Sequence, residues 1–299
     1  MRRVEALCII PFMHIAVPRQ LRENASKTAE RAEWLSGLPR LIGDLAAKWE
    51  LTVFAPFDSP DVSAAWVAPA TRASGEPVVL KVGMPHVEAA QEVDGLRYWA
   101  GDPVVRLLDA DDAAGAMLLE RCMPGTSLRE RPPEEQDRVV AGMLRRMWRP
   151  RRGSHAFRPL SYMIDAWCAE SRAQSDGWPD AALVEHGLQI MHDLSRPSPA
   201  DVLLGTDIHA GNILRAEREP WLVIDPKPFI GDSAYDATQH LINCTDRVVA
   251  DPSTTIERFA ALLDLDAERV RTWLFARAVA EPRDTWNEQS LRLGRALRR

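Results

Sequence analysis

The sequence predicts an α+β protein in which a small sheet-based part precedes a larger, mainly helical part. Apolar segments of strand length alternate with turn-forming residues in the first third of the chain, which is typical of an antiparallel sheet. From about residue 134 onward, apolar residues recur at helical spacing. One stretch with two short apolar strands, residues 205–228, interrupts this helical part. We therefore expect an N-terminal lobe over residues 1–120, with leading helices, and a C-terminal lobe over residues 121–299.

The N-terminal elements follow from local patterns. Residues 27–50 have helical spacing, and Pro39 is expected to split them into two helices. Helical spacing returns at 86–101. The expected strands of the sheet cover 51–57, 64–70, 76–83, 104–111 and 115–122.

The C-terminal part is predicted to be helical around one hairpin. The hairpin joins NILRA to PWLVIDP through a polar turn. The basic segment SLRLGRALRR, at the end of the sequence given, is expected to be a solvated, frayed tail. The expected helices cover 134–149, 160–175, 181–194, 233–249, 254–263 and 266–280.

Composition limits the possible functions. The 299 residues are 46% hydrophobic and 27% charged, with a net charge of −6, which fits a globular protein and does not favour nucleic-acid binding. No segment has the roughly 20 apolar residues that span a bilayer. The apolar run near the N-terminus is broken by Pro11 and His14, so we do not expect a signal peptide. Four widely spaced cysteines indicate reduced core residues rather than a zinc site, and a cytoplasmic protein.

Three polar residues in GTDIHAGNILRAEREPWLVIDPKP point to phosphoryl transfer. Asn212 follows Asp207 by five positions, and Asp225 ends the next apolar strand. The first spacing is that of the protein-kinase catalytic loop, and the third residue stands where a kinase holds its metal. Magnesium prefers such oxygen ligands, with phosphate and water completing its shell. We therefore predict a catalytic Asp207 with Asn212 and Asp225 as metal ligands.

A cation for the phosphates is predicted at Lys81. It lies in the apolar segment VVLKVG, where an unpaired ammonium is costly. Glu88 and Glu92 share one face of the following helix, and we prefer Glu92 as its partner.

Each of these residues also has a structural interpretation when taken alone. Lys81 could lie at a strand edge with its ammonium in solvent, and the three polar residues could be turn or cap residues. We expect His209 to be structural, with hydrogen bonds inside the loop. The order and element types of the whole set favour the functional interpretation.

These motifs resemble those of the aminoglycoside phosphotransferase superfamily, and more narrowly the branch of streptomycin 6-kinases and hydroxyurea phosphotransferases. Besides the 205–228 stretch, WLSGLPRL, VVLKVG, HVEAAQEVDGLRYWAG and AMLLERCMPGTSL carry the likeness, which extends from about residue 30 to 285. The resemblance implies a two-lobed, protein-kinase-like fold that binds ATP and magnesium. It also implies that Lys81, braced by Glu92, contacts the phosphates. Leu119, Glu120 and Cys122 would then belong to the segment beside the adenine.

The sequence departs from the family pattern at three places. Gly205-Thr206-Asp207 replaces the His-Gly-Asp of many relatives, and Pro226-Lys227 replaces the Phe-Gly of kinases. The turn FDSPDVSAAW has no glycine to cover phosphate, although Ser59 or Ser63 could contribute. Lys227 could add charge near the phosphates or pair with Asp232.

We therefore interpret the chain as a small-molecule kinase that phosphorylates a hydroxyl of an aminoglycoside such as streptomycin. Hydroxyurea or an unrelated alcohol is the alternative acceptor, and a catalytically silent nucleotide-binding protein is the alternative from another class. A protein kinase fits less well, because little room is left for an activation loop after Asp225. The sequence does not predict an oligomeric state. Acidic candidates for holding a cationic acceptor are Asp232, Asp236, Glu281 and Asp284, although Asp236 and its neighbours could instead cap a helix or brace the metal loop.

Overall fold

The computed structural model describes residues 15–58, 63–148 and 157–298. The chain divides into two compact units, each described here by itself. Unit 1 contains the residues up to Ala90 together with Leu107–Arg121. Unit 2 contains Gln91–Arg106 and the residues from Cys122 onward. Ser59, the N-terminal apolar run up to His14 and the last residue of the predicted helix 134–149 lie outside the described residues.

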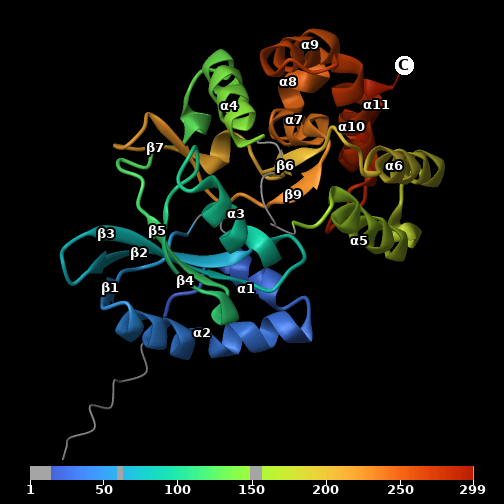
Figure 1. Ribbon diagram of the computed structural model, residues 1–299. Helices are drawn as coiled ribbons and strands as arrows, with labels where there is room; N and C mark the ends of the chain where they lie inside the picture. The colour runs from blue at the N-terminus through green and yellow to red at the C-terminus, as the bar shows by residue number, and fades with distance from the viewer. Residues whose placement is uncertain (1–14, 59–62, 149–156, 299) are drawn as a thin grey trace, which may run out of the picture. The chain divides into compact units, whose positions relative to one another are not determined.

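Unit 1 is an antiparallel sheet packed on helices, in the strand order β1-β2-β3-β5-β4. This confirms the predicted sheet (Figure 1). The strands are β1 (Leu51–Val53), β2 (Ala65–Arg72), β3 (Pro77–Gly83), β4 (Leu107–Asp111) and β5 (Ala116–Glu120). The helices are α1 (Arg19–Ala25) and α2 (Ala29–Lys48), and the short turn η2 (Asp112–Ala114) joins β4 to β5.

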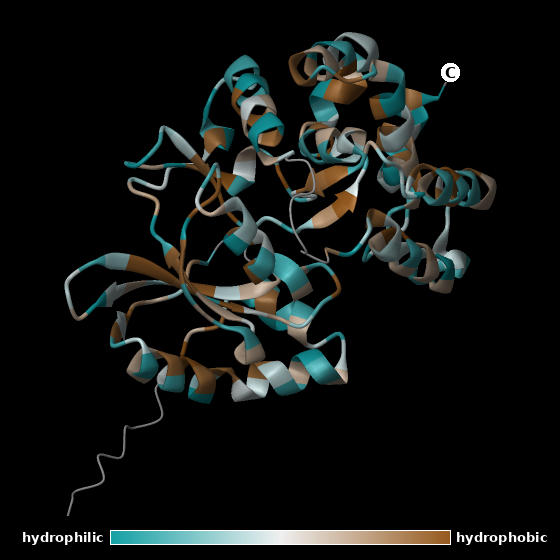
Figure 2. Ribbon diagram, viewed as in Figure 1, coloured by the Kyte–Doolittle hydropathy of each residue, from teal (hydrophilic) through white to brown (hydrophobic). Residues whose placement is uncertain are grey.

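The predicted break at Pro39 is wrong, because α2 runs through it. Leu38, Ile42 and Leu45 lie on both sides of the proline and are buried in one core with Trp66 and Leu80 of the sheet. Figure 2 shows the corresponding alternation of apolar and polar residues along α2. Burial of this apolar face outweighs the roughly 3 kcal/mol that an interior proline costs.

Unit 2 is mainly helical. Its helices are α3 (Glu92–Trp99), α4 (Pro133–Met147), α5 (Leu160–Ala173), α6 (Ala181–Leu194), α7 (Ser233–Ile242), α8 (Thr245–Ala250), α9 (Pro252–Leu263), α10 (Ala267–Ala280) and α11 (Arg292–Leu297). The predicted helix 233–249 is in fact two helices, α7 and α8. Asn243 donates to the carbonyl of Gln239, and Thr245 donates to that of Ile242. Such local side-chain bonds compete with the helical ladder.

Two strand pairs lie within unit 2. The predicted hairpin is present as β7 (Ile213–Arg215) and β8 (Trp221–Val223), paired antiparallel. A second pair, β6 (Val202–Leu204) with β9 (Phe229–Gly231), encloses the motif in sequence and was not predicted. The β6–β9 pair therefore holds the two ends of the polar stretch together, and the hairpin lies inside it.

The prediction of a frayed tail is wrong for the described residues. Residues Glu288–Leu291 form the turn η6, and α11 buries Leu293 and Leu297. Gly294 lies so close to Val279 of α10 that an added Cβ would overlap its side chain. Apolar residues at helical spacing between the arginines account for this packing.

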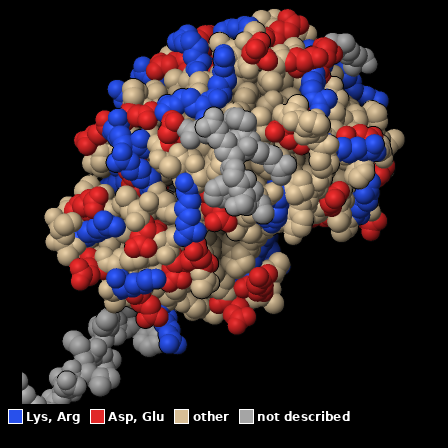
Figure 3. All heavy atoms as spheres, viewed as in Figure 1, with Lys and Arg blue, Asp and Glu red and all other residues tan. Residues whose placement is uncertain are grey.

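The surface charge, the cysteines and the hydropathy of the helices can be compared with the predictions from composition. On the face drawn in Figure 3, acidic and basic side chains are interspersed. Cys122 and Cys168 are buried free thiols, and Cys244 is a half-buried one. Among the helices of the described ranges, none combines the length and apolar character needed to cross a bilayer.

Candidate functional site

The loop that carries Asp207 begins where β6 ends and is held by one buried carboxylate. Asp236 of α7 is fully buried and accepts hydrogen bonds from the backbone N–H groups of Gly205, at 3.0 Å, and Thr206, at 2.8 Å. The indole N–H of Trp148 donates to the same carboxylate at 2.9 Å. Burial raises the pKa of Asp236 to about 6, although these donors act in the opposite direction. Asp236 is therefore a brace for the loop and is not available to an acceptor.

Thr206 takes a backbone conformation that side chains with a branched Cβ seldom adopt. Its φ is +47°. Its hydroxyl donates to the carbonyl of Lys227 at 2.8 Å, and the backbone N–H of Lys227 donates to the carbonyl of Gly205 at 2.8 Å. These two bonds join the loop to the segment after β8 and stabilise the turn at Thr206.

The position of the missing histidine is filled by apolar atoms. A Cβ on Gly205 would lie 2.5 Å from Cγ1 of Ile208 and 2.8 Å from Cε of Met147. A larger side chain would need these two residues to move. The loop is instead organised by Asp236, so the departure at Gly205 removes no support that this structure depends on.

Side chains from the loop and from α7 fix the Asp207 carboxylate. Oδ1 accepts from Nε2 of Gln239 at 2.7 Å, and Oδ2 faces Nδ2 of Asn212 at 3.2 Å. Nε2 of His209 lies 3.7 Å from Oδ1. His209 also accepts from the N–H of Gly211 through Nδ1, at 3.0 Å, which agrees with its predicted structural role. The Asp207 side chain remains about one third exposed, at 31%.

The β7–β8 hairpin explains the spacing from Asn212 to Asp225. Ile213 pairs with Val223, and the N–H of Ile224 donates to the carbonyl of Asn212 at 2.9 Å. Asn212 and Asp225 therefore flank the open end of one hairpin. Asp225 has φ +56°, which turns the chain directly after the strand. Its side chain is 34% exposed.

Lys227 joins Asp225 to the first turn of α3. Its Nζ forms ion pairs with Asp225 and with Oε2 of Glu92, the latter at 3.0 Å. Lys227 and Glu92 are both buried. Burial favours the neutral amine, but the carboxylates of Asp225 and Glu92 outweigh it and raise the pKa of Lys227 above its ordinary value.

Of the two alternatives for Lys227, the pairing with Asp232 is therefore wrong, because its ammonium pairs with Glu92 and Asp225. Asp232 caps α7 through the N–H of Ala234 and accepts from Arg269 at 2.6 Å and from Trp273 at 2.7 Å. These donors hold its carboxylate against α10. This is the capping role that the sequence analysis left open.

The other two acidic candidates lie near the end of α10. Glu281 forms an ion pair with Arg277 at 3.1 Å and lines a cavity of about 300 Å³. Asp284 lies beyond α10 and is exposed. Of the four acidic candidates, these two are the most exposed, so an acceptor could reach them most readily.

The predicted nucleotide residues of unit 1 lie on two neighbouring strands. Lys81 of β3 is 5% exposed and pairs in register with Met117 of β5. Leu119 of β5 is buried, and Glu120, the last residue of β5, pairs in register with Val78 of β3. Cys122 is buried and is assigned to unit 2. The pairing of Lys81 with Glu92 would join two units and stays a prediction.

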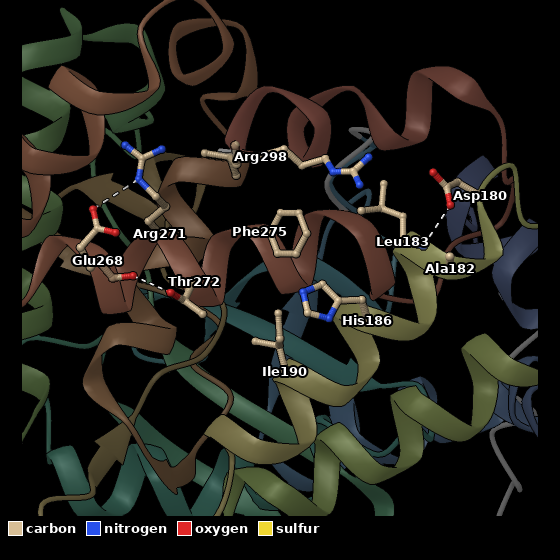
Figure 4. Close-up of a pocket in the computed structure, with 11 residues that line it drawn as sticks. Asp180, Ala182, Leu183, His186, Ile190, Glu268, Arg271, Thr272, Phe275 and Arg298 are labelled. Carbon is tan, nitrogen blue, oxygen red and sulfur yellow. Dashed lines mark hydrogen bonds and ion pairs between the residues drawn. The ribbon is translucent and has the colours of Figure 1, made fainter.

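A larger cavity of about 520 Å³ lies elsewhere in unit 2 (Figure 4). His186 and Ile190 of α6 face Arg271, Thr272 and Phe275 of α10 across it. None of the predicted site residues lines this cavity.

Sequence reasoning missed Gln239 and Arg277. Gln239 lies on an ordinary amphipathic helix, and the contacts that join it to Asp207 and to Arg277 are between residues distant in sequence. A signal was present only for Arg277, as a charged residue inside the apolar run of α10.

The family is established by comparison with known proteins. Residues 50–289 match the family model described as "Aminoglycoside/hydroxyurea antibiotic resistance kinase". A "Streptomycin 6-kinase" of Streptomyces griseus is 33% identical, over 88% of this chain and 89% of the relative. A "Hydroxyurea phosphotransferase" of Kitasatospora aureofaciens is 34% identical, over 93% of this chain and 81% of the relative.

The solved structures agree with the predicted fold class. The choline kinase LicA from Streptococcus pneumoniae superposes with a TM-score of 0.57 at 13% identity, over 81% of this chain and 87% of that one. The α+β, protein-kinase-like fold is therefore confirmed. The match of the family model and the two relatives shows that the chain belongs to the aminoglycoside/hydroxyurea antibiotic resistance kinases.

Proposed function

We propose that this kinase transfers the γ-phosphoryl group of ATP to a hydroxyl of an aminoglycoside-type antibiotic, with streptomycin as the leading acceptor. The observation that carries the proposal is the convergence of Asp207, Asn212 and Asp225 at one loop and hairpin of unit 2. The family and the relatives named streptomycin 6-kinase support the acceptor class.

Asp207 is proposed as the catalytic residue. Its carboxylate is partly exposed and is fixed in orientation by Gln239 and Asn212. A carboxylate held in this way can accept the proton of an acceptor hydroxyl, or orient that hydroxyl toward the γ-phosphorus. The acceptor oxygen then forms the new P–O bond while the bond to the β-phosphate oxygen breaks. This yields the phosphorylated acceptor and ADP.

The donor set fits magnesium. Asn212 and Asp225 supply an amide oxygen and a carboxylate, which are hard ligands suited to Mg²⁺ with phosphate and water. The nucleotide phosphates and water would complete the coordination. The metal would neutralise phosphate charge, and we propose that Lys81 contacts the phosphates from its strand.

The acceptor contacts are proposed at Glu281 and Asp284. Glu281 shares its charge with Arg277, so an acceptor guanidinium or amine would compete with Arg277 for that carboxylate. Hydroxyurea is the second candidate acceptor, because the named hydroxyurea phosphotransferase is as similar to the chain as the streptomycin kinase.

An ADP-release assay with ATP and magnesium tests the acceptor. The panel contains streptomycin, other aminoglycosides, hydroxyurea and simple sugars, each with wild type and with Asp207→Ala. Turnover that depends on streptomycin and is lost in the variant supports the proposal. Turnover with hydroxyurea alone would reassign the acceptor. ATP binding without turnover across the panel would favour a silent nucleotide-binding protein.

A further inference from the structure

We propose that Gln239 is a positioning residue for Asp207, and that Arg277 fixes the Gln239 amide in the orientation this task requires. The inference rests on the proposed function, because it takes Asp207 as the catalytic carboxylate. It adds Gln239 of α7 and Arg277 of α10 to the residues that hold the catalytic loop.

The hydrogen-bond pattern assigns the orientation of the Gln239 amide. Nη2 of Arg277 lies 2.7 Å from Oε1 of Gln239. A guanidinium only donates, so the atom that it faces must be the amide oxygen. The amide N–H₂ is thereby directed at the other neighbour, Oδ1 of Asp207, at 2.7 Å.

Arg277 is itself held on several sides. Its side chain is 2% exposed and donates to the Thr238 hydroxyl at 2.7 Å. It also pairs with Glu281 at 3.1 Å and lies over the ring of Tyr235, with 4.4 Å between Cζ and the ring centroid. A guanidinium with this many fixed partners has little rotamer freedom left, so it is a rigid support for the Gln239 amide.

These contacts orient the Asp207 carboxylate. Gln239 holds Oδ1, while the contact of Asn212 with Oδ2 is longer, at 3.2 Å, and Asn212 also donates to the Asp207 backbone at 2.9 Å. The hydrogen bond from Gln239 is therefore the shorter of the two side-chain contacts to the Asp207 carboxylate. Each carboxylate oxygen retains capacity to accept a further bond from an acceptor hydroxyl.

Replacement of Gln239 by Met tests the proposal, because Met keeps the length and flexibility of the side chain and removes the donor. The matched control is Gln189→Met on α6, where the exposed glutamine donates to Asp193 at the surface. With the acceptor that wild type uses, Q239M is expected to lower kcat by about tenfold or more and to leave KM for ATP within about threefold. Q189M should keep both values. A kcat of Q239M within about twofold of wild type would overturn the proposal.

Crystal structures of wild type and Q239M give a readout that does not depend on turnover. The expected result is an Asp207 carboxylate that rotates or occupies two rotamers in Q239M, in an otherwise unchanged loop. An unchanged carboxylate would overturn the positioning role even if activity fell. If wild type phosphorylates no acceptor, the proposed function fails, and the rotamer of Asp207 still decides whether Gln239 positions it.

Discussion

Nζ of Lys227 lies 3.0 Å from Oε2 of Glu92, a residue 135 positions earlier in the chain. Both side chains are buried, at 6% and 2% exposure, and the same ammonium contacts Asp225. The lysine that stands where kinases have the glycine of Asp-Phe-Gly is therefore built into the core of unit 2. It connects the helix of Glu92 to the predicted metal ligand.

Lys227→Met should destabilise the protein by about 3–5 kcal/mol, because it leaves Glu92 buried without its cation. The measurement is the free energy of unfolding by chemical denaturation. The control is Arg172→Met, which breaks the exposed pair with Glu185 and should cost under about 1 kcal/mol. Equal losses for the two variants would show that the Lys227 pair is not a buried one in solution.

Asp236→Asn should change how stability depends on pH. The folded pKa of Asp236, about 6, lies above its ordinary value of 3.8. Between these values the folded state keeps a proton that the unfolded state has released, so wild-type stability falls as pH rises from about 4 to 6. The fall is on the order of 3 kcal/mol.

The asparagine variant has no such titration. At pH 4 it should be less stable than wild type by about 1–3 kcal/mol, since its amide N–H₂ meets backbone or indole donors. The wild type loses about 3 kcal/mol of stability as pH rises to 7 and the variant does not, so the difference should vanish or reverse, measured by denaturation at a series of pH values. A difference that stays constant or widens would contradict the assigned direction.

The sequence predicted the three polar residues of the candidate site, but it did not predict the contacts that hold them in place. Asp207, Asn212 and Asp225 stand at fixed spacing along one loop and hairpin, and that spacing is a local property. The partners of Asp236, Gln239 and Lys227 are set by how distant helices pack, which local patterns do not encode.

The fold shows the same division. Strands, hairpin and most helices followed from periodicity, whereas the unbroken α2 at Pro39 and the docked α11 did not. In both cases packing decided the outcome: α2 buries its apolar face on the sheet, and α11 buries its leucines against its own unit. Tertiary burial outweighed a local signal for a break or for fraying.

Gly294→Ala tests the docking of α11. The added Cβ would lie 2.0 Å from Cγ1 of Val279, and such overpacking costs about 1–3 kcal/mol. The matched control is Gly142→Ala in α4, where nothing lies within 4 Å of the added atom. That change should stabilise by up to about 1 kcal/mol. Thermal denaturation of both variants is the measurement, and a neutral G294A would indicate that the C-terminal helix is loose in solution.

Asp225→Asn should weaken the use of magnesium. Loss of the anionic ligand is expected to raise the magnesium concentration for half-maximal activity by about tenfold or more. Magnesium titration at fixed ATP measures it. Asp165→Asn, at an exposed carboxylate of α5, is the control and should titrate as wild type. An unchanged midpoint in D225N would remove Asp225 from the metal site.

The most direct test of the central claim is transfer of the labelled γ-phosphoryl group from ATP to streptomycin by wild type and by Asp207→Asn, with magnesium present. Asparagine keeps the shape of the side chain and an oxygen that can accept the hydrogen bond from Gln239, but it cannot take a proton from the substrate hydroxyl. We predict labelled streptomycin with wild type and a rate lower by about 10²-fold or more with the variant, at unchanged ATP affinity. Equal rates for both proteins would contradict the assignment of Asp207 as the catalytic residue.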